Sequence, residues 1–253
     1  MEETIVLKIG GVASDNLTAA FFEQISKWQV LGKRVIVVHG GGHYVTEMMQ
    51  ILSQEVQTKN GLRVTDSKAL ETTRMVLLGK VQPLIMTAFQ KHGLAAVGLN
   101  AGCDRLIEGQ VKDFEKLGFV GEVTKVNELL INQLSAKKHI PVIAPLGITK
   151  EGQWLNINAD DVACGIAQAI QADKLYLMTD VPGVQIDGHW IDEMAVSAIA
   201  KGIEKGSITG GMIPKLLGAK NAIEQSVKKV IITNDLLHPG TEISAVIDAA
   251  IAS

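Results

Sequence analysis

Aromatic residues are scarce in this chain of 253 residues, since Phe, Trp and Tyr together make up only 4% of it. So few rings argue against a surface that stacks on nucleic-acid bases. An excess of one charge is also lacking: the formal net charge is −3, which gives no general attraction to polyanions or acidic membranes. We therefore expect no nucleic-acid partner and no membrane partner.

Cysteine is rare as well, and Cys103 and Cys164 lie far apart without forming a Cys-x-x-Cys pair. Two cysteines in a chain of this length do not make a disulfide framework, so a reducing compartment is the simplest interpretation. The chain also lacks the roughly 18 consecutive apolar residues of a membrane span. Its acidic start, Met1–Thr4, has no basic region like that of a signal peptide. These absences predict a soluble, cytoplasmic protein.

Hydrophobic residues are abundant, at 47% against 20% charged, which excludes a disordered chain. Six apolar runs without alternation are typical of strands buried on both faces of a parallel sheet. They are Ile5–Ile9, Arg34–Val38, Leu94–Gly98, Ile140–Ala144, Lys174–Met178 and Val230–Thr233. Helical spacing predicts helices over Asn16–Leu31, Tyr44–Val56, Ser67–His92, Val126–Lys137, Asp160–Ala172 and Pro214–Gln225. This alternation predicts an α/β fold with right-handed crossovers.

Three polar segments interrupt the alternation and have the turn signals of hairpins. Residues 106–126 predict a small hairpin insertion, and residues 147–158 predict a hairpin that turns at Glu151-Gly152. Residues 185–191 contain Asp187-Gly188 between β-forming residues. No linker divides the chain, so we expect two lobes on one continuous sheet, residues 1–173 and 174–253.

A lysine, Lys8, lies in the middle of the first apolar run, and Gly10 and Gly11 follow the run directly. An unpaired buried ammonium is costly, so Lys8 should meet a carboxylate or an anionic ligand. The alternative is an edge strand whose lysine points to water. Two residues without Cβ let a ligand approach the backbone, and this favours an anion site.

The second apolar run is followed by His39-Gly40-Gly41-Gly42 and then a predicted helix. A helix N-terminus presents free N–H donors and a positive dipole end, so this turn indicates an anion site. A turn that needs glycine only for steric reasons is the alternative. The same tetrapeptide occurs in esterase oxyanion holes, but the chain has no Gly-x-Ser-x-Gly elbow. We interpret His39 as a structural hydrogen-bonding residue rather than as a metal ligand together with His43.

Polar residues that could bind an amino acid occur at two places. Arg63 is the strong cation of a polar loop and could grip a carboxylate with two hydrogen bonds, although exposure to solvent is the ordinary alternative. Asn156 and Asn158, two residues apart, should share one face of a strand and offer both donors and acceptors. Asp160 could cap the next helix or act as the anion that holds nearby lysines.

Two further loops predict ligand contacts. The loop after the fifth apolar run should lie at the carboxyl end of a parallel strand, where α/β proteins bind ligands. It comprises Thr179, Asp180, Val181, Pro182, Gly183 and Val184. A glycine-rich turn, Gly206–Gly211, precedes the last helix and puts Lys215 in its first turn. The helix dipole disfavours a cation in the first turn. A lysine placed against this preference, beside a predicted anion site, indicates a phosphate partner.

Taken together, these motifs resemble the amino acid kinase family over nearly the whole chain. The resemblance is carried by Lys8–Gly11, His39–Gly42, Asn60–Thr65, Asn156–Asp160, Thr179–Gly183 and Gly210–Lys215. The Gly-Leu-Arg-Val-Thr and Asn-x-Asn-Ala-Asp segments are similar to the acetylglutamate branch rather than to the uridylate, carbamate or aspartate kinases. The resemblance implies a three-layer α/β/α sandwich around a mainly parallel central sheet, the carbamate kinase-like fold, in two lobes.

The resemblance also implies an activity: transfer of the γ-phosphoryl group of ATP to the side-chain carboxylate of N-acetyl-L-glutamate, in arginine biosynthesis. Lys8 and Lys215 would contact the phosphoryl group and Asp160 would orient them. The implied phosphate-binding residues are Gly10, Gly11 and Gly41, and the implied substrate-binding residues are Gly41, Gly42, Arg63, Asn156 and Asn158. The implied nucleotide-binding residues are Thr179, Asp180, Val181, Pro182, Gly183, Val184, Ser207, Ile208 and Thr209. Mg²⁺ would arrive with ATP, without a dedicated protein site.

The resemblance assigns amino-acid binding and homodimer formation to the first lobe and ATP binding to the second. Arginine-inhibited relatives have an additional N-terminal helix, and the early first strand here predicts a dimer insensitive to arginine. A kinase acting on N-acetylaminoadipate is an alternative, because one methylene discriminates by only about 1–3 kcal/mol. A catalytically silent amino-acid-binding regulator on this fold is a second alternative, and an ester hydrolase is a distant third.

Overall fold

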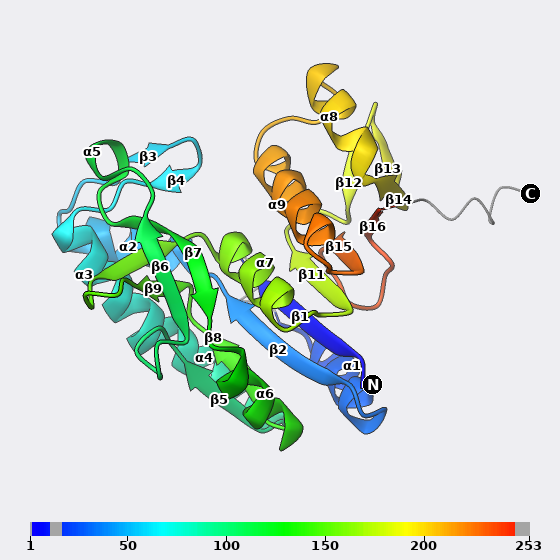
Figure 1. Ribbon diagram of the computed structural model, residues 1–253, viewed down its shortest axis with the longest axis horizontal. Helices are drawn as coiled ribbons and strands as arrows, with labels where there is room; N and C mark the ends of the chain where they lie inside the picture. The colour runs from blue at the N-terminus through cyan, green and yellow to red at the C-terminus, as the bar shows by residue number, and fades with distance from the viewer. Residues whose placement is uncertain (1, 11–16, 246–253) are drawn as a thin grey trace, which may run out of the picture.

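The computed structural model describes residues 2–10 and 17–245. Its centre is an eight-stranded sheet in the order β14-β16-β15-β11-β1-β2-β8-β5 (Figure 1). The six expected apolar runs form its adjacent parallel strands: β1 (Thr4–Ile9), β2 (Arg34–His39), β5 (Ala96–Leu99), β8 (Ile140–Ile143), β11 (Lys174–Met178) and β15 (Lys229–Thr233). At one edge, β16 (Thr241–Ser244) runs antiparallel to β15 and parallel to β14 (Glu193–Ala195).

Helices cover both faces of this sheet. The first face packs against α1 (Ala19–Val30), α2 (Gly42–Ile51), α3 (Ser67–Val76) and α4 (Gln82–Lys91). The second packs against α6 (Glu128–Ala136), α7 (Ala159–Ala169), α8 (Val196–Glu204) and α9 (Met212–Glu224). Strand side chains alternate between the two cores: Val35 and Val37 join the first, and Ile36 and Val38 the second. The predicted three-layer α/β/α fold with a mainly parallel sheet is confirmed.

The long helix expected over Ser67–His92 is interrupted. A π-helical turn, η2 (Leu77–Val81), lies between α3 and α4. Such a turn inserts a residue into the helix without a sequence signature of its own. The helices α8 and α5 (Phe114–Leu117) were not predicted, and α5 is too short to give a sustained helical pattern.

The hairpins expected at residues 106–126 and 147–158 join into one closed four-stranded barrel in the order β10-β7-β6-β9. The first hairpin pairs β6 (Ile107–Val111) with β7 (Val120–Val126), and the second pairs β9 (Leu146–Ile148) with β10 (Trp154–Ile157). Leu155 and Ile157 fill its interior. They pack so closely against Gly121 and Gly147 that a Cβ atom at either glycine would collide with them. The sequence predicted each hairpin but not their union, which depends on long-range packing.

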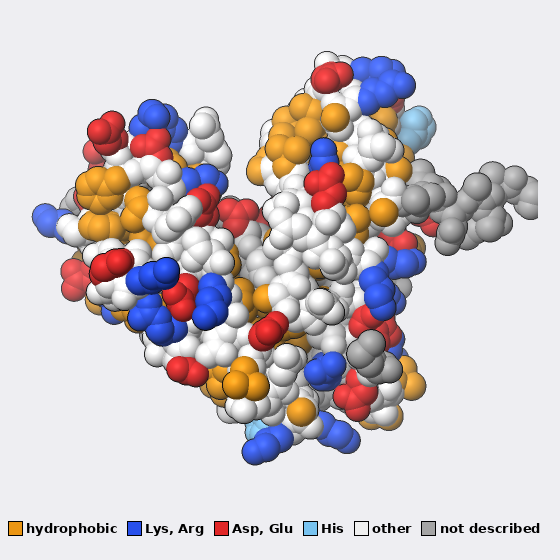
Figure 2. Space-filling view, viewed as in Figure 1, with side chains coloured by type: hydrophobic (Ala, Val, Ile, Leu, Met, Phe, Trp, Pro, Cys, Tyr) orange, Lys and Arg blue, Asp and Glu red, His pale blue; other side chains and the backbone are white. Residues whose placement is uncertain are grey.

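Two arms rise from the sheet (Figure 1). One arm has α5 and the hairpin of β3 (Thr58–Lys59) and β4 (Leu62–Arg63). The other has α8 and the hairpin of β12 (Val184–Ile186) and β13 (His189–Ile191), which turns at Asp187-Gly188 as expected. Figure 2 shows a deep notch between the two arms, which we call the cleft. A cavity of about 840 Å³ in the cleft is lined by Lys59 and Lys116 of the first arm and by Asp160 of α7 and Pro214 of α9.

No helix in the described ranges is long and apolar enough to cross a bilayer.

Candidate active site

The ends of several elements meet at one edge of the sheet, at the base of the cleft. β1 and β2 run in parallel with Ile9 opposite His39, so their carboxyl ends share this edge. The helix α2 begins here, directly after β2. The first turns of α7 and α9 bring Asp160 and Lys215 to Lys8 of β1. This is where α/β proteins bind ligands.

Asp160 forms ion pairs with Lys8 and Lys215, each with a nitrogen–oxygen distance of 2.8 Å. The side chains of Lys8, Lys215 and Asp160 are only 12%, 11% and 19% exposed, respectively. Lys8 lies between β2 and β11 in the centre of the sheet, so the edge-strand alternative is wrong. Two ammonium groups against one carboxylate leave an excess positive charge that suits an anionic ligand.

The Asp160 carboxyl stays ionised. Burial alone would raise its pKa, but attraction to Lys8 and Lys215 and hydrogen bonds from both hold the pKa below its ordinary value. The alternative role of Asp160 as helix cap is wrong. Asn158 caps α7, and its Oδ1 accepts hydrogen bonds from the backbone N–H groups of Asp160 at 2.8 Å and Asp161 at 3.4 Å. Asp160 therefore has both oxygens available to the lysines.

Gly10 makes room for the Lys8 side chain. A Cβ added at Gly10 would collide with the ammonium nitrogen of Lys8. Gly10 also lines a cavity beside the lysine, so the approach of a ligand to its backbone stays a prediction. Gly11, the other glycine of the pair, lies outside the described residues.

The glycine turn after β2 has a conformation that only glycine adopts easily. Gly41 has φ of +134°, and an added Cβ would lie 2.9 Å from Val81 Cγ2 and 3.0 Å from Leu77 Cδ2. The backbone N–H groups of Gly41 and Gly42 donate to no described residue. They lie at the start of α2, where such donors can bind an anion.

His39 is fully buried just before this turn. Its Nδ1 lies 2.8 Å from the Gly40 carbonyl oxygen, which can only accept, so Nδ1 carries the proton. Burial lowers the pKa of His39 to about 4, against the smaller opposing effect of the Gly40 carbonyl. No group of three His, Cys, Asp or Glu side chains in the described ranges could hold a metal.

This histidine predicts a loss of stability in acid. A histidine with the ordinary pKa of 6.5 in the unfolded chain and about 4 in the folded protein binds more protons when unfolded between these values. The free energy of unfolding therefore falls as the pH drops through this window, by about 2 kcal/mol between pH 7.5 and pH 5. Urea unfolding at both pH values, for the wild type and His39→Asn, measures it. An equal pH dependence in the two proteins would contradict the assignment.

Beside the charged cluster lies a cavity of about 280 Å³. Arg63 borders it and is half-buried, so the solvent-exposed alternative is wrong. Its guanidinium donates to the Gly42 carbonyl at 2.9 Å and to Thr46 Oγ1 at 2.8 Å. Burial lowers the pKa of Arg63, but a guanidinium stays protonated in proteins. Arg63 and Lys8 thus place two cations in the wall of this cavity.

The two predicted asparagines have different roles in the wall of this cavity. Asn156 belongs to β10, and its Nδ2 donates to Thr65 Oγ1 at 3.0 Å. Asn158 lies one residue beyond the strand and caps α7, so the expectation that both share a strand face is wrong in this detail. Both residues border the cavity.

Further residues line the cavity, and no motif in the sequence predicts them. They are Val45, Thr58, Leu62, Thr73, Leu77, Val120 and Pro145, among others. The hydroxyl of Thr73 is buried, and no residue in the described ranges forms a hydrogen bond with it. These residue types are ordinary inside helices, strands and turns, and only the folded chain brings them together, so the sequence contained no signal for them.

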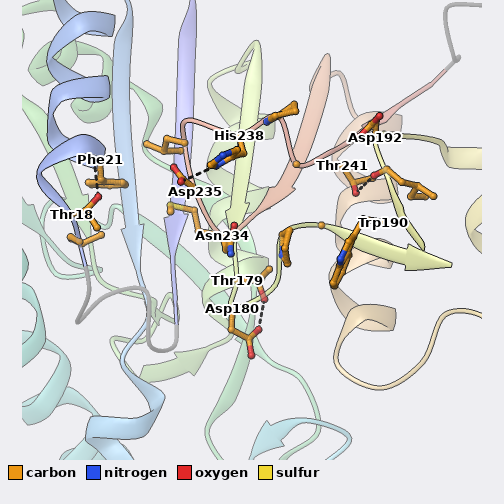
Figure 3. Close-up of a pocket in the computed structure, with 18 residues that line it drawn as sticks. Thr18, Phe21, Thr179, Asp180, Trp190, Asp192, Asn234, Asp235, His238 and Thr241 are labelled. Atoms are coloured by element: carbon orange, nitrogen blue, oxygen red, sulfur yellow. Dashed lines mark hydrogen bonds and ion pairs between the residues drawn. The ribbon is translucent and has the colours of Figure 1, made fainter. Parts of the chain in front are cut away.

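The two segments expected to bind a nucleotide do not line one cavity. Thr179, Asp180, Pro182 and Gly183 border a cleft of about 710 Å³ at the carboxyl ends of β11 and β15. Figure 3 shows Asp235, His238 and Trp190 around the same space. The segment Ser207–Thr209 is not part of this lining, and the Ile208 side chain is buried in the core on the α9 side of the sheet.

Val184 likewise has a buried side chain, so only its backbone could contact a ligand. A threonine fixes this end of the loop. Thr241 Oγ1 accepts a hydrogen bond from the Val184 N–H at 2.8 Å. The same hydroxyl donates to the Ile191 carbonyl, and Figure 3 shows this second bond. The loop before β12 is therefore held against β16 by one buried hydroxyl.

Comparison with known proteins agrees with this architecture. Residues 3–234 match the amino acid kinase family, and the chain belongs to that family. More particularly, 245 residues are 54% identical to a Listeria monocytogenes serotype 4a (strain HCC23) protein named acetylglutamate kinase, covering 97% of this chain and 98% of that relative. The resemblance seen in the motifs is thereby confirmed.

Solved structures agree as well. The crystal structure of smu.665 from Streptococcus mutans UA159 is similar with a TM-score of 0.92 and 36% identity, covering 97% of this chain and 100% of that one. Carbamate kinase from Giardia lamblia bound to AMP-PNP has a TM-score of 0.70 at 17% identity, covering 97% of this chain and 99% of that one. That second likeness shows a shared fold.

Proposed function

We propose that this chain transfers the γ-phosphoryl group of ATP to the side-chain carboxylate of N-acetyl-L-glutamate. The product is N-acetyl-L-glutamyl 5-phosphate, formed in the second step of arginine biosynthesis. The observation that carries the proposal is the cluster of Lys8, Asp160 and Lys215 beside a cavity with Arg63 in its wall. The name of relatives that are 54% or 55% identical over nearly the whole chain supports the choice of substrate.

The chemistry needs positioning more than bond activation. A carboxylate is already a nucleophile, so no general base is required, but two anions must be brought into line and neutralised. Lys8 from β1 and Lys215 from α9 would contact the transferring phosphoryl group. Asp160 orients both ammonium groups and remains a carboxylate throughout. The N–H groups of Gly41 and Gly42, which donate to no described residue, would stabilise negative charge on the reacting oxygens.

The small cavity suits the amino acid. Its volume of about 280 Å³ is slightly smaller than that of pockets that bind drug-sized ligands, which start at about 300 Å³. Arg63 would bind the α-carboxylate through two N–H···O hydrogen bonds, and Asn156 would contact the same end of the substrate. Gly41 and Lys8 line the same cavity as Arg63, so the side-chain carboxylate would reach the phosphoryl group there.

For the nucleotide, we propose contacts with the Thr179–Val184 loop and the turn before α9, which includes Ser207–Thr209. Asp160 is engaged by two ammonium groups, and no cluster of metal-binding side chains occurs in the part of the chain that is described. We therefore treat Mg²⁺ as part of the MgATP substrate, held by phosphate oxygens and water.

Residues 1–173 would form the amino-acid lobe and residues 174–253 the ATP lobe of a cytoplasmic homodimer. Exposed apolar side chains on α2, α3 and α4 support pairing through the first lobe: Ile51, Met75 and Leu84 are 66%, 53% and 53% exposed. Light scattering should give the mass of two chains. A monomer would contradict the pairing.

Hydroxamate trapping tests the activity directly. The protein is mixed with MgATP, hydroxylamine and one acceptor, either N-acetyl-L-glutamate, N-acetyl-L-aminoadipate or L-glutamate. The expected result is ATP-dependent hydroxamate with the highest kcat/KM for N-acetyl-L-glutamate. A preference for aminoadipate would reassign the acceptor. Absence of product with every acceptor would contradict the kinase proposal and favour a silent binding protein.

Arg63→Ala should raise the KM for N-acetyl-L-glutamate by about 10- to 100-fold, with kcat within about fivefold of wild type, because it removes ground-state binding of a carboxylate. The KM for ATP should stay unchanged. Arg105→Ala is the matched control, since Arg105 donates to the Thr149 carbonyl outside the cavity. An unchanged KM for the acceptor in Arg63→Ala would remove Arg63 from the binding site.

A further inference from the structure

Both peptide groups that flank Gly40 are held by the protein. On one side, the Gly40 N–H donates to the Ile9 carbonyl at 2.6 Å, which ties the end of β2 to the end of β1. On the other side, the Gly40 carbonyl accepts from Nδ1 of His39 at 2.8 Å. A glycine has unusual backbone freedom, so without these bonds the peptide between Gly40 and Gly41 could rotate easily.

The hydrogen bond from His39 sets the direction of the next N–H. In a trans peptide the carbonyl and the N–H point to opposite sides, and the described chain has no cis peptide. His39 has the same parity in β2 as Val35 and Val37, whose side chains join the core under α1–α4. The Gly40 carbonyl is turned toward this buried ring. The Gly41 N–H is therefore turned away from it, where Gly41 borders the 280 Å³ cavity.

We propose that His39 is a positioning residue that locks the Gly40–Gly41 peptide so that the Gly41 N–H, and not a carbonyl oxygen, faces the reacting anions. This inference rests on the proposed function, since it assigns that N–H to the charge of the phosphoryl transfer. Rotation of the peptide would present an oxygen to the anions and replace an attraction with a repulsion.

The surroundings of the other ring nitrogen, Nε2, suggest two variants that distinguish this positioning role from a general packing role. His39 Nε2 is buried and has no hydrogen-bond partner among the described residues. A side chain that keeps a donor at the Nδ1 position and has nothing at the Nε2 position should therefore preserve the lock. Asparagine fits this description, because its Nδ2 falls near the place of Nδ1. Glutamine is the opposite case, because its Nε2 falls near the place of histidine Nε2.

The test compares His39→Asn with His39→Gln, which are both polar and both smaller than the imidazole ring. Steady-state kinetics with N-acetyl-L-glutamate and MgATP are measured at a temperature where circular dichroism shows each variant folded. We expect His39→Gln to lower kcat by about 10- to 100-fold, as the loss of one oriented donor does, and His39→Asn to stay within about fivefold of wild type. His92→Gln is the control, since His92 Nδ1 makes the same kind of contact with the Ala88 carbonyl away from the cavity.

Wild-type kcat in His39→Gln would overturn the proposal, and so would an equal loss in both variants. If the variants do not fold, the ¹⁵N spectrum of the wild-type imidazole decides, because the proposal requires the proton on Nδ1 and the Nε2 tautomer would refute it. That spectrum does not depend on activity. A wild-type protein that phosphorylates no acceptor would remove the proposed function while leaving the tautomer result to judge the lock.

Discussion

Alanine in place of Lys8 or Lys215 is expected to lower kcat by about 10²- to 10³-fold or more, with a change in either KM below about tenfold. Each ammonium group lies 2.8 Å from Asp160, and the two approach the phosphoryl site from β1 and from α9. Neither can take over from the other, because they meet the transferring group from different elements. Initial rates of hydroxamate formation at saturating MgATP and N-acetyl-L-glutamate measure the effect.

Lys220→Ala is the matched control for the lysine substitutions. Lys220 lies on the same helix as Lys215 and pairs with Glu224 at 3.8 Å on the surface. Its removal should leave kcat and both KM values unchanged, since exposed ion pairs contribute about 0–1 kcal/mol. Wild-type turnover in Lys8→Ala would refute the mechanism, and an equal loss in Lys220→Ala would show that the effect is one of folding or total charge.

Asp160→Asn should destabilise the protein and impair catalysis together. It leaves two ammonium groups, each hardly exposed, without the carboxylate between them. Removing one partner of a buried ion pair costs about 3–5 kcal/mol, so the free energy of unfolding should fall by a similar amount. We expect kcat to fall by about 10²-fold, because both lysines lose the group that orients them. Urea unfolding and steady-state kinetics measure the two effects.

Asp161→Asn is the control for the neighbouring position. Burial raises the pKa of Asp161, and it forms no ion pair with another described residue, so its negative charge is poorly compensated. Loss of that charge should leave stability unchanged or slightly higher. If Asp160→Asn were as mild as Asp161→Asn in both unfolding and kcat, the central role of Asp160 would be wrong.

Much of the fold follows from local chemistry in the sequence. The apolar runs predicted the buried parallel strands, because consecutive Val and Ile side chains are all buried only when both faces of the strand are covered. Lys8 predicted an anionic partner, because burying an unpaired ammonium costs free energy that a negative charge must offset. The turn at Asp187-Gly188 predicted its hairpin, because its residues adopt the left-handed backbone that such a turn needs.

The remaining features depend on contacts between distant segments. Asn158, rather than Asp160, caps α7, and both residue types are good caps, so the sequence did not distinguish them. The segments Thr179–Val184 and Ser207–Thr209 do not border one cavity, although both follow the pattern of ligand loops. Thr73 reaches the small cavity only because α3 packs beside β10. None of these placements has a signal within a short stretch of residues.

The barrel beside the cleft has a consequence for how the protein behaves at high concentration. Each of its four strands is paired on both sides, because β9 contacts β10 and β6, and β7 contacts β6 and β10. Two separate hairpins would have exposed unpaired N–H and C=O groups next to the cleft, which are templates for strand addition by another chain. Closure satisfies these groups within the molecule. The insertion can therefore form a wall of the cleft without becoming a starting point for aggregation.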